Sequence, residues 1–211
     1  MTSILQAEAY NKIRDINVTE SLTDEVLQQL GHIFTRHGVH DQFGIALLHR
    51  HFDLYDGEVM VHQQADPTVI ECSPLDLHHG LTACSWYLND EDALQPYEYM
   101  LANAKSESPS SSFFQDVQEF LMVRGLKHAA VVAVAKQITE LSNIQIETLH
   151  ADRRMMRTTT YTRAETEDLD IDNPHKFKTT AWSFSNKSGL GVVAFKKCVL
   201  MASGIHEVRS D

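Results

Sequence analysis

Short runs with the composition of β-strands fill most of this sequence beyond residue 43, and they constrain its fold more than any other feature. These runs are rich in β-branched, aromatic and aliphatic residues, which pack well on a pleated surface. The run 129–135 also fits a buried helix, but its valines, which are stiff at χ1, favour a strand. The runs cover residues 43–52, 58–62, 68–72, 81–88, 129–135, 144–149, 157–161, 179–184 and 192–200.

Two segments show the period of an amphipathic helix instead. In the first, apolar residues recur at helical spacing, Thr23 can cap the helix and Gly38 can end it, which predicts a helix over about residues 23–37. The second begins after a serine-rich loop, carries Phe113 at its start and stops near Gly125. The sequence therefore predicts an α+β fold, in which two principal helices pack on a mainly antiparallel sheet.

The length of 211 residues suits one domain, so we expect a single domain over residues 1–211. A weak amphipathic pattern in residues 1–20 predicts a short helix that frays. The segment 163–176 is rich in Asp and Glu and lies between strand-like runs. We expect it to be an exposed, mobile loop or a lid.

The charge balance disfavours a nucleic-acid partner. The chain has 18 Lys and Arg against 29 Asp and Glu, a formal charge of −11, and no basic cluster longer than Arg153-Arg154. Such a surface offers little attraction to a phosphate backbone. No run reaches the roughly 18 apolar residues of a membrane helix. We therefore expect a small-molecule substrate and neither a nucleic-acid nor a membrane partner, while the oligomeric state stays open.

The cysteines and the N-terminal residues predict a cytoplasmic protein. Cys72, Cys84 and Cys198 are widely spaced and form no Cys-x-x-Cys pair, so neither a disulfide framework nor a thiolate zinc site is expected. The first residues carry an acid where a signal peptide needs basic residues and a long apolar run.

Several of the twelve histidines gather around a predicted β-hairpin. Asp56-Gly57 favours a tight turn between two strand-like runs. Because residues i and i+2 of a strand share a face, His49 and His51 share one, and a loop of even length puts His62 on the same side. Cross-strand neighbours lie about 5 Å apart. We therefore expect the three imidazoles to converge on one point.

Three imidazoles at one point can hold a metal ion, and Asp53 or Glu58 could add an oxygen ligand. Such a set suits iron, zinc, manganese or copper and leaves positions open for water or substrate. Without a metal, His49 or His51 could act as a catalytic acid or base, since histidine titrates near neutrality. A purely structural role is the third reading. His78, on a following loop, is an alternative ligand.

Two other features of the sequence, a cysteine on a strand and a pair of glycines, are weaker candidates for a functional site. Cys84 and Trp86 are expected to share a strand face, where core packing is favoured over a cysteine–histidine nucleophile. Gly189 and Gly191 lack the strand, glycine-rich turn and helix order of a phosphate-binding fingerprint. No nucleotide cofactor is therefore expected.

The segment from His49 to His51 resembles the His-x-His motif that opens the metal site of the cupins. In that family a glutamate and a later histidine follow. Here six residues separate His51 from Glu58, where the family has three or four, and the glycine after the glutamate strand is absent. The resemblance implies that His62 or His78 takes the place of the missing ligand.

A second resemblance is to a group of small fungal proteins to which no activity is attached. It rests on Leu-His-Arg-His-Phe at 48–52, Gly-Glu at 57–58 and Pro-Tyr-Glu-Tyr at 96–99. This resemblance implies a fungal origin, where small proteins of this kind serve natural-product pathways.

Taken together, these features predict a small-molecule-processing enzyme with a histidine-lined pocket. With a transition metal, the expected chemistry is oxidation or hydrolysis. Without one, it is isomerisation, dehydration or cyclisation by proton transfer. The alternative is a non-catalytic module that binds a small molecule or a protein.

Overall fold

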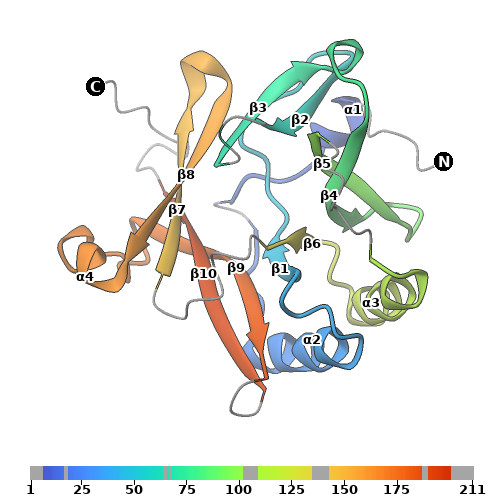
Figure 1. Ribbon diagram of the computed structural model, residues 1–211, viewed down its shortest axis with the longest axis vertical. Helices are drawn as coiled ribbons and strands as arrows, with labels where there is room; N and C mark the ends of the chain where they lie inside the picture. The colour runs from blue at the N-terminus through green and yellow to red at the C-terminus, as the bar shows by residue number, and fades with distance from the viewer. Residues whose placement is uncertain are drawn as a thin grey trace.

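A computed structural model of the chain describes residues 7–16, 19–63, 66, 68–101, 109–134, 143–186 and 190–200. In this part of the chain, ten strands close into one barrel in the order β1-β6-β4-β5-β2-β3-β8-β7-β10-β9, and β9 pairs with β1 to complete the ring (Figure 1). The strands are β1 (Phe43–Leu47), β2 (Glu58–His62), β3 (Val69–Pro74), β4 (Leu81–Leu88), β5 (Leu94–Leu101), β6 (Ala129–Ala133), β7 (Asn143–His150), β8 (Met155–Thr162), β9 (Phe177–Ser185) and β10 (Gly191–Val199).

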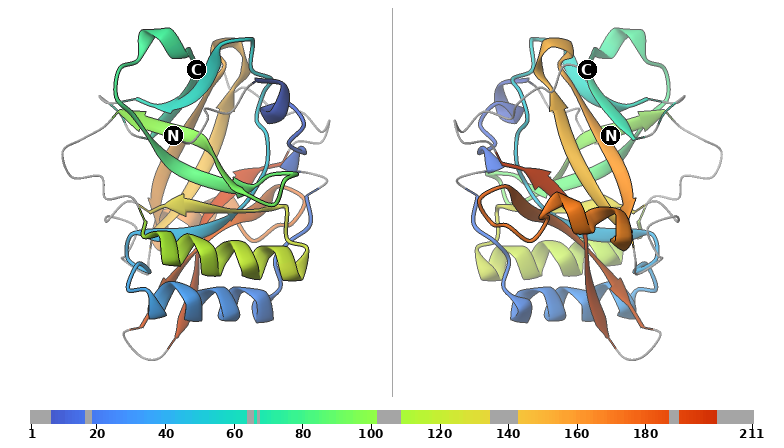
Figure 2. Two further views of the ribbon diagram at one scale, coloured as in Figure 1. Left: turned by 90° about the vertical axis from the view of Figure 1, so that its right-hand side faces the viewer. Right: turned by 90° about the vertical axis from the view of Figure 1, so that its left-hand side faces the viewer.

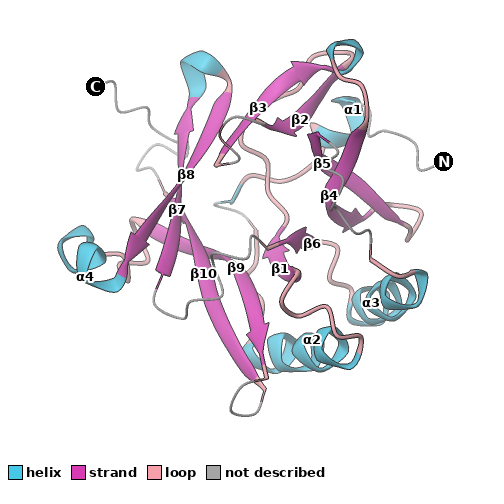
Figure 3. Cartoon of the chain, in the orientation of Figure 1, coloured by secondary structure: helices cyan, strands magenta, loops and turns pink. Residues whose placement is uncertain are grey.

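The predicted α+β fold, with a mainly antiparallel sheet and two principal helices packed on it, is wrong. Strands dominate the molecule and close on themselves (Figure 3). The barrel is also mixed, because β2 runs parallel to β5 and β7 runs parallel to β10. Closure pairs the N–H and C=O groups that an open sheet leaves at its edges. Strand composition located most of the strands, including β6, but it carries no information about which strands become neighbours.

The predicted hairpin between residues 43–52 and 58–62 is also wrong. The neighbours of β1 are β6 and β9, whereas those of β2 are β3 and β5. Asp56-Gly57 does form a turn, in which Gly57 has φ +81° and the Glu58 N–H donates to the Tyr55 carbonyl. However, the Leu48 N–H donates to the His128 carbonyl in the register of β1 and β6, so the end of β1 stays with β6 and does not turn toward β2. The turn is therefore local and joins no hairpin.

The two long helices form where the sequence predicts them. The helices are α2 (Asp24–Arg36), capped by the Thr23 side chain, and α3 (Ser111–Arg124), capped by Ser110 and ended by Gly125 at φ +65°. They lie side by side against one side of the barrel (Figure 2).

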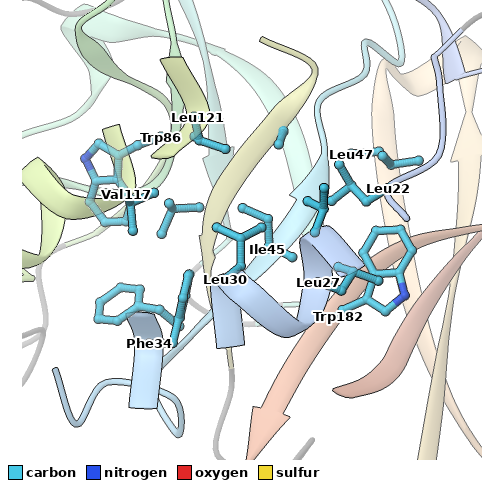
Figure 4. Close-up of a cluster of buried hydrophobic side chains, with 14 of the residues drawn as sticks. Leu22, Leu27, Leu30, Phe34, Ile45, Leu47, Trp86, Val117, Leu121 and Trp182 are labelled. Carbon is cyan, nitrogen blue, oxygen red and sulfur yellow. The ribbon is translucent and has the colours of Figure 1, made fainter. Parts of the chain in front are cut away.

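The main hydrophobic core lies between these helices and the outer face of the barrel (Figure 4). Alternate residues of β1, such as Ile45 and Leu47, face the helices because successive side chains of a strand point to opposite faces. Phe34 of α2 contacts the rings of Phe113 and Phe184. This packing holds both helices on β1, β4, β6 and β9.

A second cluster fills part of the barrel interior. Its strand residues come from six strands around the ring, so their side chains meet inside it, together with residues of the N-terminal segment. They include Tyr10, Met60, Ile70, Tyr87, Tyr97, Ala130 and Met156.

The N-terminal segment, predicted to fray, is packed into the barrel in its described part. Tyr10, at the end of α1 (Ala7–Tyr10), is fully buried in the interior cluster. Asn11 donates its amide to the Leu54 carbonyl and accepts from the Leu54 N–H, at 2.9 and 2.8 Å. These bonds tie the segment to the chain that carries His51.

The acidic segment 163–176 folds into two short helical turns, α4 (Arg163–Thr166) and η5 (Glu167–Leu169). Ile171 is buried, and Lys197 donates to Asp172 at 2.9 Å. The mobility of this segment stays a prediction. Among the described residues, no helix combines the length and apolar composition needed to cross a bilayer.

Candidate functional site

The barrel interior holds charged side chains next to the apolar cluster. Glu98 and Glu147 are carboxylates on strands, and Lys196 is an ammonium whose side chain is only 22% exposed. Removing such groups from water is costly unless other charges or hydrogen bonds compensate. Buried charge of this kind is a recognised mark of functional sites.

His49 presents one ring nitrogen toward this interior. Its Nδ1 donates a hydrogen bond to the Leu47 carbonyl at 2.8 Å, because a carbonyl oxygen can only accept. Nε2 is therefore the ring nitrogen that is left to face the interior. Nε2 lies 3.7 Å from Oε2 of Glu147, and neither atom has a hydrogen-bond partner among the described residues. The two side chains are 7% and 5% exposed.

The other carboxylate oxygen of Glu147 is paired. Lys196 Nζ lies 3.0 Å from Oε1. Burial raises the pKa of Glu147. The Lys196 ammonium and His49 outweigh this effect and hold the pKa well below its usual range. Burial likewise lowers the pKa of Lys196, and Glu147 and Glu98 more than restore it. The interior therefore holds a carboxylate with one free oxygen beside His49.

His51 and Cys198 complete the group around His49. The rings of His49 and His51 are 4.6 Å apart at their centroids. One ligand atom from each of His49, His51 and Cys198 lies within 4.8 Å of the others. Cys198 stands opposite Glu147 in the parallel register of β10 and β7, so both face the same side of the sheet. Burial and Glu147 raise the pKa of the Cys198 thiol.

The donor atoms of this group are of the types that bind transition metals, and they lie within 4.8 Å of one another. Zinc bonds of about 2.0–2.3 Å in tetrahedral geometry place two ligand atoms roughly 3.4–3.6 Å apart. Two imidazoles and a thiolate select zinc or copper over magnesium and calcium. If these three residues held an ion, a further position would remain for water or substrate, and Oε2 of Glu147 lies 3.7 Å from Nε2 of His49.

A second polar group lies on β2, β4 and β5. One ligand atom from each of His62, Cys84 and Glu98 lies within 4.8 Å of the others, and Ser85 Oγ donates to Glu98 at 2.6 Å. Burial lowers the pKa of His62, but Cys84 and Glu98 raise it well above its ordinary value. Burial raises the pKa of Glu98, but His62 and Ser85 outweigh it and lower the value.

The structure separates the residues that the sequence placed together. His49 and His51 share one group, whereas His62 belongs to the other. Both Glu58 oxygens accept from Arg154, at 2.7 and 2.8 Å, and His78 Nε2 is hydrogen-bonded to Ser73 Oγ at 2.7 Å. Asp53 pairs with Arg50 at 2.6 Å. Because no hairpin joins β1 to β2, their registers do not align the three histidines.

Sequence reasoning missed Glu147, Lys196 and Glu98 as site residues and treated Cys198 as a buried thiol. A signal for Glu147 and Lys196 was present, since each is a charged residue inside a run of strand composition, whereas Glu98 lies outside the runs that the sequence identified. Such a residue either faces solvent or lies inside a polar barrel, and the sequence alone does not distinguish these cases.

The hollows found on the surface lie elsewhere. A groove of about 840 Å³ is lined by residues that include Arg14, Asp90 and His128, and another of about 570 Å³ lies beside α4. Neither groove is lined by His49, His51 or His62.

We compared the chain with family models, with curated proteins and with solved structures, and none of them matched. The functional argument therefore rests on the geometry of the two interior groups.

Proposed function

We propose that this protein is a metal-dependent enzyme for a small organic molecule, with a zinc-type ion held by His49, His51 and Cys198. The observation that carries the proposal is the unsatisfied pair of buried atoms, Nε2 of His49 and Oε2 of Glu147. A buried polar atom without a partner is costly, so a native site of this kind calls for a ligand or ion.

With a zinc-type ion, the site would support hydrolysis and not oxidation. A zinc-type ion supplies Lewis acidity and a nucleophilic water at neutral pH, and it has no redox chemistry of its own. With an ion bound, the unpaired oxygen of Glu147 would accept a hydrogen bond from the nucleophilic water, while Lys196 holds its other oxygen at 3.0 Å. The Nδ1 bond from His49 to Leu47 keeps the ligand nitrogen aimed inward.

Metal-free proton transfer is the second candidate. It is favoured by Lys196, which already neutralises Glu147 at 3.0 Å, so the carboxylate needs no metal to stay buried. In that case His49 acts as the acid or base beside Glu147, and the chemistry is isomerisation, dehydration or cyclisation.

Elemental analysis of protein purified without chelator tests the first proposal. We expect near-stoichiometric zinc or a related transition metal, or its uptake by the apo-protein. Iodoacetamide footprinting then locates the ion, because a bound metal should protect Cys198 and leave Cys84 unprotected. Turnover of small amides should vanish with chelator and return with Zn²⁺.

Variants separate the proposed ligands from other histidines. His49→Ala and Cys198→Ser should each lose the metal, by roughly 10–100-fold in affinity or more. His78→Ala is the matched control and should retain it. A protein that stays metal-free after incubation with zinc, copper, iron and manganese contradicts the metal proposal and favours proton transfer. If metal binds but no substrate turns over, the result favours a non-catalytic binding module.

A further inference from the structure

The group of His62, Cys84 and Glu98 is independent of the proposed metal ligands and carries its own chemistry. Its three side chains come from three strands, β2, β4 and β5, that are neighbours in the barrel. Met60 belongs to the interior cluster, so His62, two residues later on the same strand, also faces the interior. Glu98 stands opposite Met60 in register. The group therefore lies inside the barrel.

A β-bulge brings Cys84 into this group. The pairing of β4 with β5 shifts on both sides of Ser85, so Cys84 has no partner in the ladder. Ala83 and Trp86 both pack on the outer cluster although they are three residues apart. The bulge thus turns Cys84 and Ser85 toward Glu98, and it corrects the prediction that Cys84 and Trp86 share a face. Bulges often redirect side chains at active sites.

The hydrogen bonding of this group differs from that of the metal-site candidate. The Glu98 carboxylate accepts from Ser85, and His62 interacts with both Cys84 and Glu98. An imidazole between a thiol and a carboxylate can take the thiol proton and hold it as an imidazolium. This arrangement has the parts of a nucleophile, a base and a group that orients the base.

Solvent reaches the group, although Cys84 itself is buried. The side chains of His62 and Glu98 are 22% and 15% exposed. A small reagent can therefore approach from the side of the imidazole. This access limits the substrate to a compact molecule.

We propose that Cys84 is a nucleophilic thiol, activated by His62 and oriented through Glu98, that accepts an acyl group from a small ester or thioester. The Cys84 proton moves to His62, and the sulfur forms a bond to the carbonyl carbon. The bond from that carbon to the leaving alcohol or thiol breaks, and the leaving group takes the proton from His62. Water then hydrolyses the thioester, which releases the acid and restores the Cys84 thiol.

The probe for this proposal is p-nitrophenyl acetate with the full chain. We expect a burst of p-nitrophenolate and an acetyl group on Cys84, located by peptide mass spectrometry. Cys72 is the internal control, because it is more exposed than Cys84 while burial raises its thiol pKa to about 12. Cys84 should react at least about tenfold faster than Cys72 at pH 7.

Two further measurements keep the test decisive. His62→Gln should slow acetylation of Cys84 by about tenfold or more. In the wild-type protein, the rate at Cys84 should change little between pH 6 and pH 8, whereas an isolated thiol gains about tenfold per pH unit in this range. This pH profile needs no variant and holds even if His62→Gln fails to fold.

Acetylation that occurs only at Cys72, or not at all, would overturn the proposal. So would an ordinary tenfold rise per pH unit at Cys84. The metal proposal can fail separately, because chelated protein should still be acetylated at Cys84, and Cys84→Ser should still bind metal.

Discussion

A Cβ atom on Gly44 would lie 2.5 Å from the backbone carbonyl oxygen of Trp182. Gly44 is on β1 and Trp182 is on β9, and these two strands close the barrel through the register Ile45↔Trp182 and Ala46↔Ala181. Glycine at this position allows the two backbones to approach. The closure of the ring therefore depends on a residue without a side chain.

Gly44→Ala should lower the free energy of unfolding by about 2 kcal/mol or more, because a backbone oxygen cannot move aside as a side chain can. Gly57→Ala is the matched control. Its Cβ meets nothing within 4 Å, and its cost is only the strain of φ +81°, about 1 kcal/mol. Urea unfolding measures both. Equal losses in the two variants would argue against a tight β1–β9 seam.

Lys196→Met should destabilise the protein by about 3 kcal/mol, because it leaves the buried Glu147 carboxylate without its ammonium partner. The melting temperature should fall by roughly 6–12 °C. Adding Glu147→Gln removes the unpaired charge and should recover part of this loss. A double variant no more stable than Lys196→Met would mean that the ion pair is not the source of the effect.

The pair of His62 and Glu98 should make stability depend on pH. The raised pKa of His62 adds stability that is complete below about pH 6.5 and is lost as the pH rises through the higher folded value. The lowered pKa of Glu98 adds stability above about pH 4.5 that is lost as the pH falls through the lower folded value. Both contributions are present between these limits.

Thermal unfolding of the wild-type protein and His62→Gln from pH 4 to pH 9 measures this contribution. The difference in melting temperature should be largest between about pH 4.5 and 6.5 and should shrink at higher pH. Subtracting the melting temperature of the variant from that of the wild-type protein at each pH cancels the effect of groups that titrate in both proteins. A difference that grows above pH 7 would contradict the raised pKa of His62.

Asn11→Ala should cost about 1–3 kcal/mol, because it leaves the N–H and C=O of Leu54 without their partners. Tyr10→Ala should cost about 3–5 kcal/mol by emptying part of the interior cluster. Lys12→Ala is the control in the same segment, since Lys12 makes an exposed pair with Glu8. A neutral Tyr10→Ala variant would show that the N-terminal segment does not stabilise the barrel.

The positions of the long helices could be predicted because their signals are local. Thr23 and Gly125 act on the residues next to them, and the helical spacing of the apolar residues is complete within each segment. Most of the ten strands could also be located from the sequence, because strand composition is a local property of each segment. In addition, the sequence placed His49 and His51 close together, and they lie in one group.

Strand pairing and the partners of the site depended on tertiary structure. Residues far apart in the chain meet only through tertiary pairing: His62 and Glu98 through the pairing of β2 with β5, and His49 and Cys198 in the closed ring. A period of two shows which residues alternate, but the inner face of a barrel and the outer face of a sheet give the same pattern. The bulge at Cys84 then changes the alternation locally. The sequence by itself determined the elements, whereas closure of the barrel decided which charged side chains are buried together, because long-range pairing depends on the packing of the whole chain.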